Sequence, residues 1–161
     1  MYCDIVLFEN STSLNSLTKN LGFDKLIFKN DFNKIGLVIS SGAANDRKLI
    51  EANKVKILVD PHVNPLKDNF HFRSSGLDQV MCKLANKNNI AIGFSLSSLI
   101  NPLLLGRMKQ NIRLCRKYGV KMKFFTFAKN KYELRNREDL LGFLRAFGMT
   151  GKEAKESLSY F

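Results

Sequence analysis

The sequence predicts an α/β fold in which parallel strands are joined by crossover helices. Short runs of β-branched and aromatic residues alternate with stretches of helical periodicity along the chain, an arrangement typical of βαβ units. Most strand runs are apolar at nearly every position, as expected when both faces of a sheet are covered. With 161 residues, 45% of them hydrophobic, the chain is expected to form one domain, residues 1–161, around a substantial core.

The first half of the chain contains strand patterns at Tyr2–Phe8, Lys25–Phe28, Ile35–Ser40 and Val55–Asp60. Helical patterns occupy Ser13–Leu21 and Asn45–Asn53. Gly22 follows the first helix, at a position where a left-handed residue often ends a helix. These elements begin the alternation of strands and helices.

The second half continues the alternation with strands at Ile90–Ser95 and Val120–Phe127 and helices at Ser75–Asn88, Pro102–Tyr118, Arg137–Phe147 and Gly151–Leu158. Capping boxes are expected at Ser75-x-x-Asp78, Asn136-x-x-Asp139 and Thr150-x-x-Glu153. Asn101 precedes Pro102, which places a capping residue before the helix position that best accepts proline. Gly119 and Gly148 are expected to end helices, as Gly22 does.

The helix that begins at Ser75 is expected to pack on the core through one apolar face. That face contains Leu77, Val80, Met81 and Leu84.

Basic charge is concentrated between Asn101 and Arg137. This stretch contains eleven Lys and Arg residues and one acid, Glu133, so it carries a net charge of +10 out of +12 for the chain. Concentrated positive charge attracts polyanions, and nucleic acid is the most common of these. The first functional expectation is therefore a surface that binds phosphates.

The helix Pro102–Tyr118 carries a basic stripe beside its apolar arc. On a helical wheel Lys109, Arg113, Arg116 and Lys117 lie together, and no acid on the helix neutralises them. We expect phosphate contacts along this stripe, and a merely solvated helix surface is the alternative. Arg107 falls outside the stripe and is open to another partner or a structural role.

Further basic residues flank this helix. Lys121 and Lys123 alternate with Phe residues in the strand Val120–Phe127; a Phe there is ordinarily core, and base stacking on the ring is the alternative. Arg73 precedes a helix whose first amides favour anions, or it pairs with an acid such as Asp78. The candidate RNA-binding residues are Arg73, Lys83, Arg107, Lys109, Arg113, Arg116, Lys117, Lys121, Lys123, Lys129, Lys131, Arg135 and Arg137.

Cysteine usage indicates a reducing compartment, and hydropathy gives no sign of a membrane span. Cys3, Cys82 and Cys115 are odd in number and contain no Cys-x-x-Cys pair, so reduced thiols are expected. No apolar stretch reaches the ~18 residues of a membrane span, and the N-terminal residues do not form a signal pattern. A cytoplasmic protein without a membrane partner is expected.

Three segments, in order, resemble protein component 3 of archaeal ribonuclease P. They are residues 73–95, residues 107–122 with Arg107-Met108-x-Gln110-Asn111-Ile112, and the closing Phe147-Gly148-Met149. The resemblance implies a TIM-barrel-like fold related to the PHP phosphoesterases, here in a shortened or incomplete barrel. It also implies a non-catalytic subunit that supports the RNA catalyst in removing the 5′ leader of precursor tRNA. The implied partners are ribonuclease P RNA, protein component 2 and further protein subunits, with precursor tRNA met indirectly.

Two alternatives remain open beside this interpretation. PHP phosphoesterases carry His-x-His after the first strand, where this chain has Phe8-Glu9-Asn10. Glu9, Asp60 and His62 would hold one Mg²⁺ at most, so no catalytic residue, metal ligand or cofactor is expected, and His62 and His71 are expected at the surface. A divergent metal-dependent phosphoesterase and a stand-alone RNA-binding barrel are the two alternatives.

Overall fold

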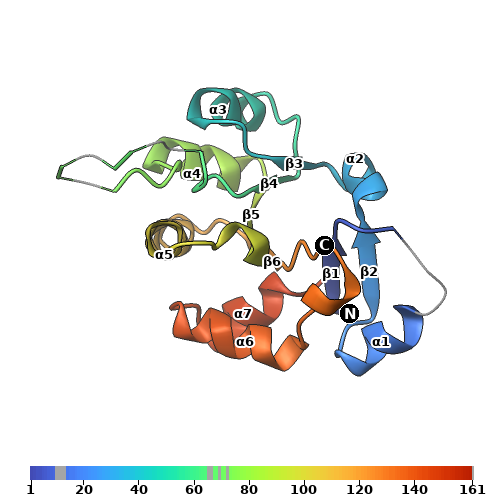
Figure 1. The fold of residues 1–161 in the computed structure, drawn as a ribbon. Coiled ribbons are helices and arrows are strands. Elements are labelled where there is room, and N and C mark those ends of the chain that lie inside the picture. The colour runs from blue at the N-terminus through green and yellow to red at the C-terminus, as the bar shows by residue number, and fades with distance from the viewer. Residues whose placement is uncertain (10–13, 65–66, 69, 72, 161) are drawn as a thin grey trace.

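The computed structural model describes residues 1–9, 14–64, 67–68, 70–71 and 73–160, and strands alternate with helices along them as expected (Figure 1). The strands are β1 (Cys3–Val6), β2 (Lys25–Phe28), β3 (Leu37–Ile39), β4 (Ile57–Val59), β5 (Ala91–Ser95) and β6 (Met122–Phe125). The helices are α1 (Leu14–Asn20), α2 (Phe32–Ile35), α3 (Ala43–Glu51), α4 (Gln79–Lys87), α5 (Pro102–Lys117), α6 (Arg137–Ala146) and α7 (Gly151–Ser157). Single 3-10 turns occupy η1 (Lys29–Asp31), η2 (Leu96–Ser98) and η3 (Lys131–Glu133). The expected first helical residue, Ser13, lies outside the described residues.

All pairings between these strands are parallel. β1 pairs with β2, and β3, β4, β5 and β6 form a sheet in that order. The two parts adjoin just beyond β6, where the Leu7 amide donates to the Ala128 carbonyl at 2.8 Å and the Phe127 amide donates to the Ile5 carbonyl at 3.0 Å. The strand order is therefore β2-β1-β6-β5-β4-β3. Within the described residues no pairing joins β2 to β3, so the TIM-barrel-like sheet is open at that position.

Alternate residues of the strands form an inner apolar cluster. Ile5, Ile27, Ile57, Val59 and Phe125 are buried together there, as expected when successive side chains of a barrel strand point inward and outward in turn. Phe125 is core, as expected, and the alternative of base stacking on its ring does not hold, because the ring is 1% exposed and stacks on that of Phe127 with centroids 6.0 Å apart.

The outward residues of the strands pack against the helices. Leu58, Ile92 and Phe124 belong to one buried cluster with Met108 of α5 and Leu144 of α6. In Figure 1, α3, α4, α5 and the α6–α7 pair lie one below another along the same side of the strands. This outer layer fixes which face of α5 is left to solvent.

The short helix α2 links β2 to β3 and was not expected from the sequence. Its Phe32 stacks on Phe127, with ring centroids 5.7 Å apart, so α2 packs on the inner cluster beside the open position of the sheet. Four residues are too few to show helical periodicity, which explains why the pattern was missed.

Helix α4 begins four residues later than expected. Asp78 is its cap and accepts a hydrogen bond from the Met81 amide at 2.7 Å, whereas Ser75 is buried before the helix. Gly76 separates them at φ +79°, and a Cβ there would lie 1.9 Å from the Pro61 carbonyl oxygen. This tight contact with the preceding loop delays the helix.

The buried face of α4 also differs from the expected one. Met81, Cys82 and Ala85 are its buried residues, while Val80 is 39% exposed. The later start of α4 removes Leu77 from the helix, although that side chain is still buried.

The expected N-cap residues of the later helices are confirmed, whereas Asn136 caps the Glu138 amide and not that of Asp139, as a capping box there would require. Asn101 accepts from the Leu104 amide at 2.9 Å, Asn136 from the Glu138 amide at 2.8 Å, and Thr150 forms a capping box with Glu153. Gly22, Gly119 and Gly148 all have positive φ. Local sequence therefore defines where these helices begin and end.

Candidate nucleic-acid interface

Helix α5 presents a row of cations to solvent. Leu104, Met108, Ile112 and Cys115 are buried, and this apolar face fixes the rotation of the helix. Lys109, Arg113 and Lys117 then lie exposed on the outer side, one turn apart. Within the described residues, none of the three has an ion-pair partner. We call these three residues the α5 row.

Arg116 differs from its neighbours in the predicted stripe. Its guanidinium donates to both carboxylate oxygens of Glu153, at 2.7 and 2.5 Å, and to the Gly148 carbonyl at 2.6 Å. The hydrogen bond from Arg116 is the main cause that lowers the pKa of Glu153 to about 2. Arg116 therefore ties α5 to α7. No acid lies on α5 itself, but one from α7 neutralises this member of the stripe.

An aromatic ring joins the α5 row to α4. The Nζ atoms of Lys83 and Lys117 lie 5.9 and 5.5 Å from the centroid of the Tyr118 ring, distances at which a cation is attracted to a ring. The Tyr118 hydroxyl donates to Gln79 Oε1 at 3.3 Å. Tyr118 gathers basic residues from two helices, a role that the sequence analysis missed because it depends on the contact between α4 and α5.

The basic residues on either side of β6 lie largely at the surface. Lys121, Lys129, Lys131 and Arg135 are exposed, and Lys131 lies over the ring of Tyr132, which is 80% exposed. These residues are available to a polyanion.

Arg137 is committed to local contacts instead. It pairs with Glu138 and its guanidinium lies 4.5 Å from the centroid of the Tyr2 ring. These contacts hold the start of α6 against β1.

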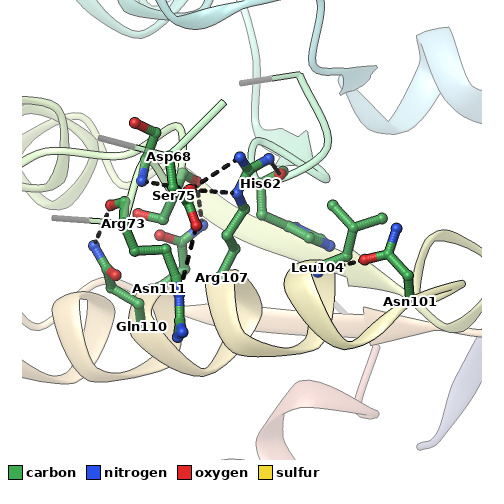
Figure 2. A network of polar contacts seen from close by, with 10 residues as sticks. His62, Asp68, Arg73, Ser75, Asn101, Leu104, Arg107, Gln110 and Asn111 are labelled. Carbon is green, nitrogen blue, oxygen red and sulfur yellow. Dashed lines mark hydrogen bonds and ion pairs between the residues drawn. The ribbon is translucent and has the colours of Figure 1, made fainter. Parts of the chain in front are cut away.

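Arg107, one of the candidate RNA-binding residues, is buried and does not lie at the surface. Its side chain is 1% exposed and its guanidinium lies 2.9 Å from Asp68. Figure 2 shows Arg107 extending from α5 toward the loop that carries His62 and Asp68, and its Nη1 donates to the His62 carbonyl at 3.4 Å. The residue serves to hold the β4–α4 loop on α5.

Arg73 shares this loop contact but remains half exposed. Its Nε lies 3.8 Å from Asp68, not from Asp78 as the sequence analysis allowed. Its guanidinium covers Gly106, where an added Cβ would lie 2.6 Å from Nη1. Gln110 and Asn111 donate to the carbonyls of Arg73 and Ser75, at 3.1 and 2.9 Å (Figure 2).

Lys123 is the second candidate RNA-binding residue that is buried. It is 8% exposed, and its ammonium donates to the carbonyls of Ser159 and Glu156 at 2.8 and 3.1 Å. Burial lowers its pKa. Lys123 holds the C-terminal residues across the inner side of β6.

Two of the three residues considered as metal ligands, Asp60 and His62, are engaged with the protein. Asp60 accepts hydrogen bonds from the Ser95 amide at 2.7 Å, from the Ser95 hydroxyl and from the Ser98 hydroxyl at 3.2 Å. Burial raises its pKa to about 6. Glu9 is exposed, and Asn10 of the same motif lies outside the described residues. In the described part of the chain, no three His, Cys, Asp or Glu side chains converge as a metal would require.

His62 is also buried, so its expected surface position is wrong. It is 0% exposed, and its Nε2 lies 3.2 Å from the Ser98 hydroxyl. Burial, followed by the nearby Arg107 charge, lowers its pKa to about 4. His71 lies at the surface as expected.

No helix in the described residues has the length and hydropathy needed to cross a bilayer. Cys3, Cys82 and Cys115 are free and buried, as expected.

Archaeal proteins called ribonuclease P protein component 3 are similar to this chain over most of its length. The Methanosarcina mazei protein is 32% identical over 76% of this chain and 51% of its own length. The Methanosarcina acetivorans protein is 31% identical over 94% of this chain and 59% of its own length. The chain thus spans between half and three-fifths of these relatives. No protein-family model matches it.

Solved structures confirm the fold class. A chain in the cryo-EM structure of archaeal ribonuclease P with mature tRNA has a TM-score of 0.65 at 20% identity, covering 98% of this chain and 78% of that one. A prolidase complexed with N-methylphosphonate-L-proline has a TM-score of 0.52 at 12% identity, covering 76% of this chain and 31% of its own.

Proposed function

Because this chain belongs to the ribonuclease P protein component 3 family, we propose that it is a non-catalytic, RNA-binding subunit of ribonuclease P. In this role it supports the RNA catalyst that removes the 5′ leader from precursor tRNA. Its partners are ribonuclease P RNA, protein component 2 and further protein subunits, and it meets precursor tRNA only indirectly. Its buried free cysteines suit the cytoplasm as the compartment.

The observation that carries the RNA-binding role is the α5 row. Three cations one helical turn apart, with no ion-pair partner in the described residues, repel one another in the free protein. Phosphates would relieve that repulsion and release counterions from the RNA, which is the main source of affinity in such contacts. Lys83, held beside Lys117 through Tyr118, widens the surface to α4.

The route to RNA binding is charge and not base reading. Two of the three cations are lysines, whose ammonium groups are point charges that suit phosphates and carry no fixed geometry for a base edge. Arg113 alone has a planar fork, which also pairs with phosphate oxygens. The α5 row is therefore expected to position the protein on folded RNA, with little dependence on sequence.

Reconstitution of precursor-tRNA cleavage tests the proposal. Cleavage is measured with ribonuclease P RNA alone, with RNA and the other protein subunits, and with this protein added. Stimulation that requires both the RNA and this protein is the expected result. Cleavage by this protein without the RNA would favour the phosphoesterase, and RNA binding without any stimulation would favour a stand-alone RNA-binding barrel.

A charge-matched comparison assigns the effect to the α5 row. Changing Lys109, Arg113 and Lys117 together to Gln is expected to remove most of the stimulation. Changing Lys29, Lys48 and Lys155 to Gln removes the same net charge from exposed positions elsewhere and is expected to leave most of it. Equal losses in the two proteins would mean that net charge, and not this surface, is responsible.

A further inference from the structure

A groove of about 860 Å³ lies across the N-terminal ends of β4, β5 and β6. Its rim comes from the three connections that precede these strands, α3–β4, α4–β5 and α5–β6, and Ser159 and Tyr160 line it from the C-terminal end. This volume lies within the range of pockets that hold small organic ligands.

The lining of the groove has two parts of different chemistry. The apolar part contains Ile57 and Ala91 of the inner cluster, with the half-buried ring of Tyr160 packed on that cluster, and Met122 of the outer cluster. The rim is polar, with exposed side chains at Asn53, Lys56, Asn89 and Lys121. One exposed acid, Glu156, also lines it and lies 3.9 Å from Lys152 of its own helix.

The polar rim is unsatisfied by the protein. Within the described residues, the carboxamides of Asn53 and Asn89 and the ammonium groups of Lys56 and Lys121 form no side-chain hydrogen bond or ion pair. By contrast, the deeper Lys123 is fully engaged with backbone carbonyls, and Arg116 with Glu153. The groove therefore offers donors and acceptors together with positive charge around an apolar centre.

Two of these features have a structural explanation that does not involve a ligand. Helices α3, α4 and α5 end at this side, and helix C-termini stabilise cations. Asn53 and Asn89 have φ of 50° and 53°, a conformation that Asn tolerates better than most residues. Neither reason accounts for an apolar hollow in the same place, so it is the combination that indicates a ligand.

We propose that this groove binds a nucleotide unit of single-stranded RNA. The base would lie on the apolar lining beside Tyr160, the two carboxamides would meet its polar edge, and Lys56 and Lys121 would contact the phosphate. The inference rests on the proposed function, because it extends the RNA-binding surface to a site of its own. The two are neighbours, since Lys117 of the α5 row and Lys121 of the groove flank Gly119.

The position is unusual for a barrel-like fold. Ligands of α/β barrels ordinarily bind at the C-terminal ends of the strands. Here Asp60, His62, Ser95 and Ser98 contact one another just beyond the C-terminal ends of β4 and β5, whereas the groove lies at the opposite ends.

Titration of the full chain with uridine monophosphate, uridine and an octauridylate, followed by two-dimensional NMR, tests the site. The monophosphate, the nucleoside uridine and the oligomer are all expected to shift the amides of Val55, Ala91 and Lys121. Changing Lys56 and Lys121 to Gln should weaken the monophosphate about tenfold and leave uridine, which lacks the phosphate, unchanged.

Two variants supply matched controls. Asn53→Gly with Asn89→Gly keeps the left-handed backbone that glycine accepts and removes only the carboxamides, so it should weaken uridine and the monophosphate alike. Lys155→Gln removes one exposed charge from α7 outside the groove and should change neither.

The outcomes separate the groove from the proposed function. If the monophosphate does not bind, or if it shifts only amides of α5, the proposal that the groove binds a nucleotide unit is wrong. The reconstitution result with the α5 row would not be affected. Tighter binding of the octauridylate than of the monophosphate supports a strand as the natural ligand. An oligomer that does not compete with the monophosphate would mean that the site takes free nucleotides, contrary to the proposal.

Discussion

Single residues of the same type have different roles here, and burial decides between them. Arg107 and Arg113 are both cations of α5, yet one is paired with Asp68 inside the molecule and the other is exposed without an ion-pair partner in the described residues. Asp4 is likewise buried, at 1% exposure, with its carboxylate accepting from the Thr126 amide at 2.7 Å and the Thr126 hydroxyl at 2.6 Å. Each assignment leads to a measurable difference.

Changing Arg107 to Met should destabilise the fold and leave RNA affinity unaltered under conditions where the protein is folded. Removing one partner of a buried ion pair costs about 3 kcal/mol at the lower end of the usual range, and Asp68 is partly exposed. Urea unfolding and RNA binding measure the two effects. Lys109→Met, two residues further along α5, should do the reverse, with stability changed by less than about 0.5 kcal/mol and weaker binding. A stable Arg107→Met protein with weakened binding would return Arg107 to the interface.

The free energy of unfolding should depend on pH through Asp4. Burial raises the pKa of Asp4 from its ordinary 3.8 to about 6, so the folded protein binds more protons than the unfolded chain between these values. Its contribution to stability is therefore greatest below pH 4 and falls by about 3 kcal/mol as the pH rises through 6.

The comparison of wild type with Asp4→Asn isolates this contribution. The amide resembles the protonated acid and does not titrate, so the stability of the variant relative to wild type should rise between pH 4 and 6. His62, whose lowered pKa of about 4 acts in the opposite direction, cancels in the comparison. A difference that is constant with pH, measured by urea unfolding, would contradict a raised pKa at Asp4.

At the scale of the elements, the packing of a helix decides which of its side chains are exposed and able to bind RNA. Helix α5 has 16 residues, and its buried face leaves the α5 row on the outside. Its start is set locally, by the cap at Asn101 and by Pro102 at the first helical position. The orientation and the start of this helix can be tested separately.

Replacing Lys109, Arg113 and Lys117 with Gln should flatten the salt dependence of RNA binding. Each lost phosphate contact removes about 0.7–0.9 units from the slope of log affinity against log salt concentration, so the triple variant should lose about 2 units. Binding is measured between 50 and 200 mM salt. Arg116 is left unchanged, because its pair with Glu153 also joins α5 to α7. An unchanged slope in a folded variant would mean that the row is only solvated.

Asn101→Ala should lower the free energy of unfolding by about 1 kcal/mol, since the Leu104 amide loses its capping acceptor. Asn101→Asp keeps an acceptor at the same position and should retain most of the stability. Urea unfolding of the three proteins checks the order. If the alanine and aspartate variants lose equal stability, the cap does not contribute as the geometry indicates.

At the scale of the whole molecule, the two ends of the strands in the open barrel differ in the side chains that surround them. Just beyond the C-terminal ends of β4 and β5, Asp60, Ser95, Ser98 and His62 contact one another within the protein. At the N-terminal ends the three helix-to-strand connections surround the groove. Because Asp60 and His62 are already engaged at the C-terminal ends, we expect the protein to bind RNA and not to hydrolyse it.

The purified protein is therefore expected not to cleave precursor tRNA with Mg²⁺, Mn²⁺ or Zn²⁺. A metal would have to displace the serine hydroxyls from Asp60 and enter beside the buried His62. Gel analysis of precursor tRNA after incubation with each metal tests this. Metal-dependent cleavage that is lost in Glu9→Ala or Asp60→Ala would favour the phosphoesterase instead.

Local sequence was sufficient for most of the elements and for several of their ends. Apolar periodicity and capping residues near each helix predicted the parallel alternation, the start of α5 at Pro102 and the end of α6 before Gly148. The exceptions are instructive. Helix α2 is too short to show a period, and α4 starts late because Gly76 must approach the Pro61 carbonyl, a contact between residues that are distant in sequence.

Charge in the sequence predicted a basic surface, but only the tertiary structure decided which cations belong to it. Lys109, Arg113 and Lys117 are exposed as their spacing indicates. Arg107, Lys123 and Arg116 are bound by Asp68, by the carbonyls of Glu156 and Ser159, and by Glu153, all from segments 30 or more positions away. The groove depends in the same way on three connections and the C-terminal residues. Periodicity reports which face of one element is buried, whereas an ion pair or a cavity depends on which elements meet, and that is set by the packing of the whole chain.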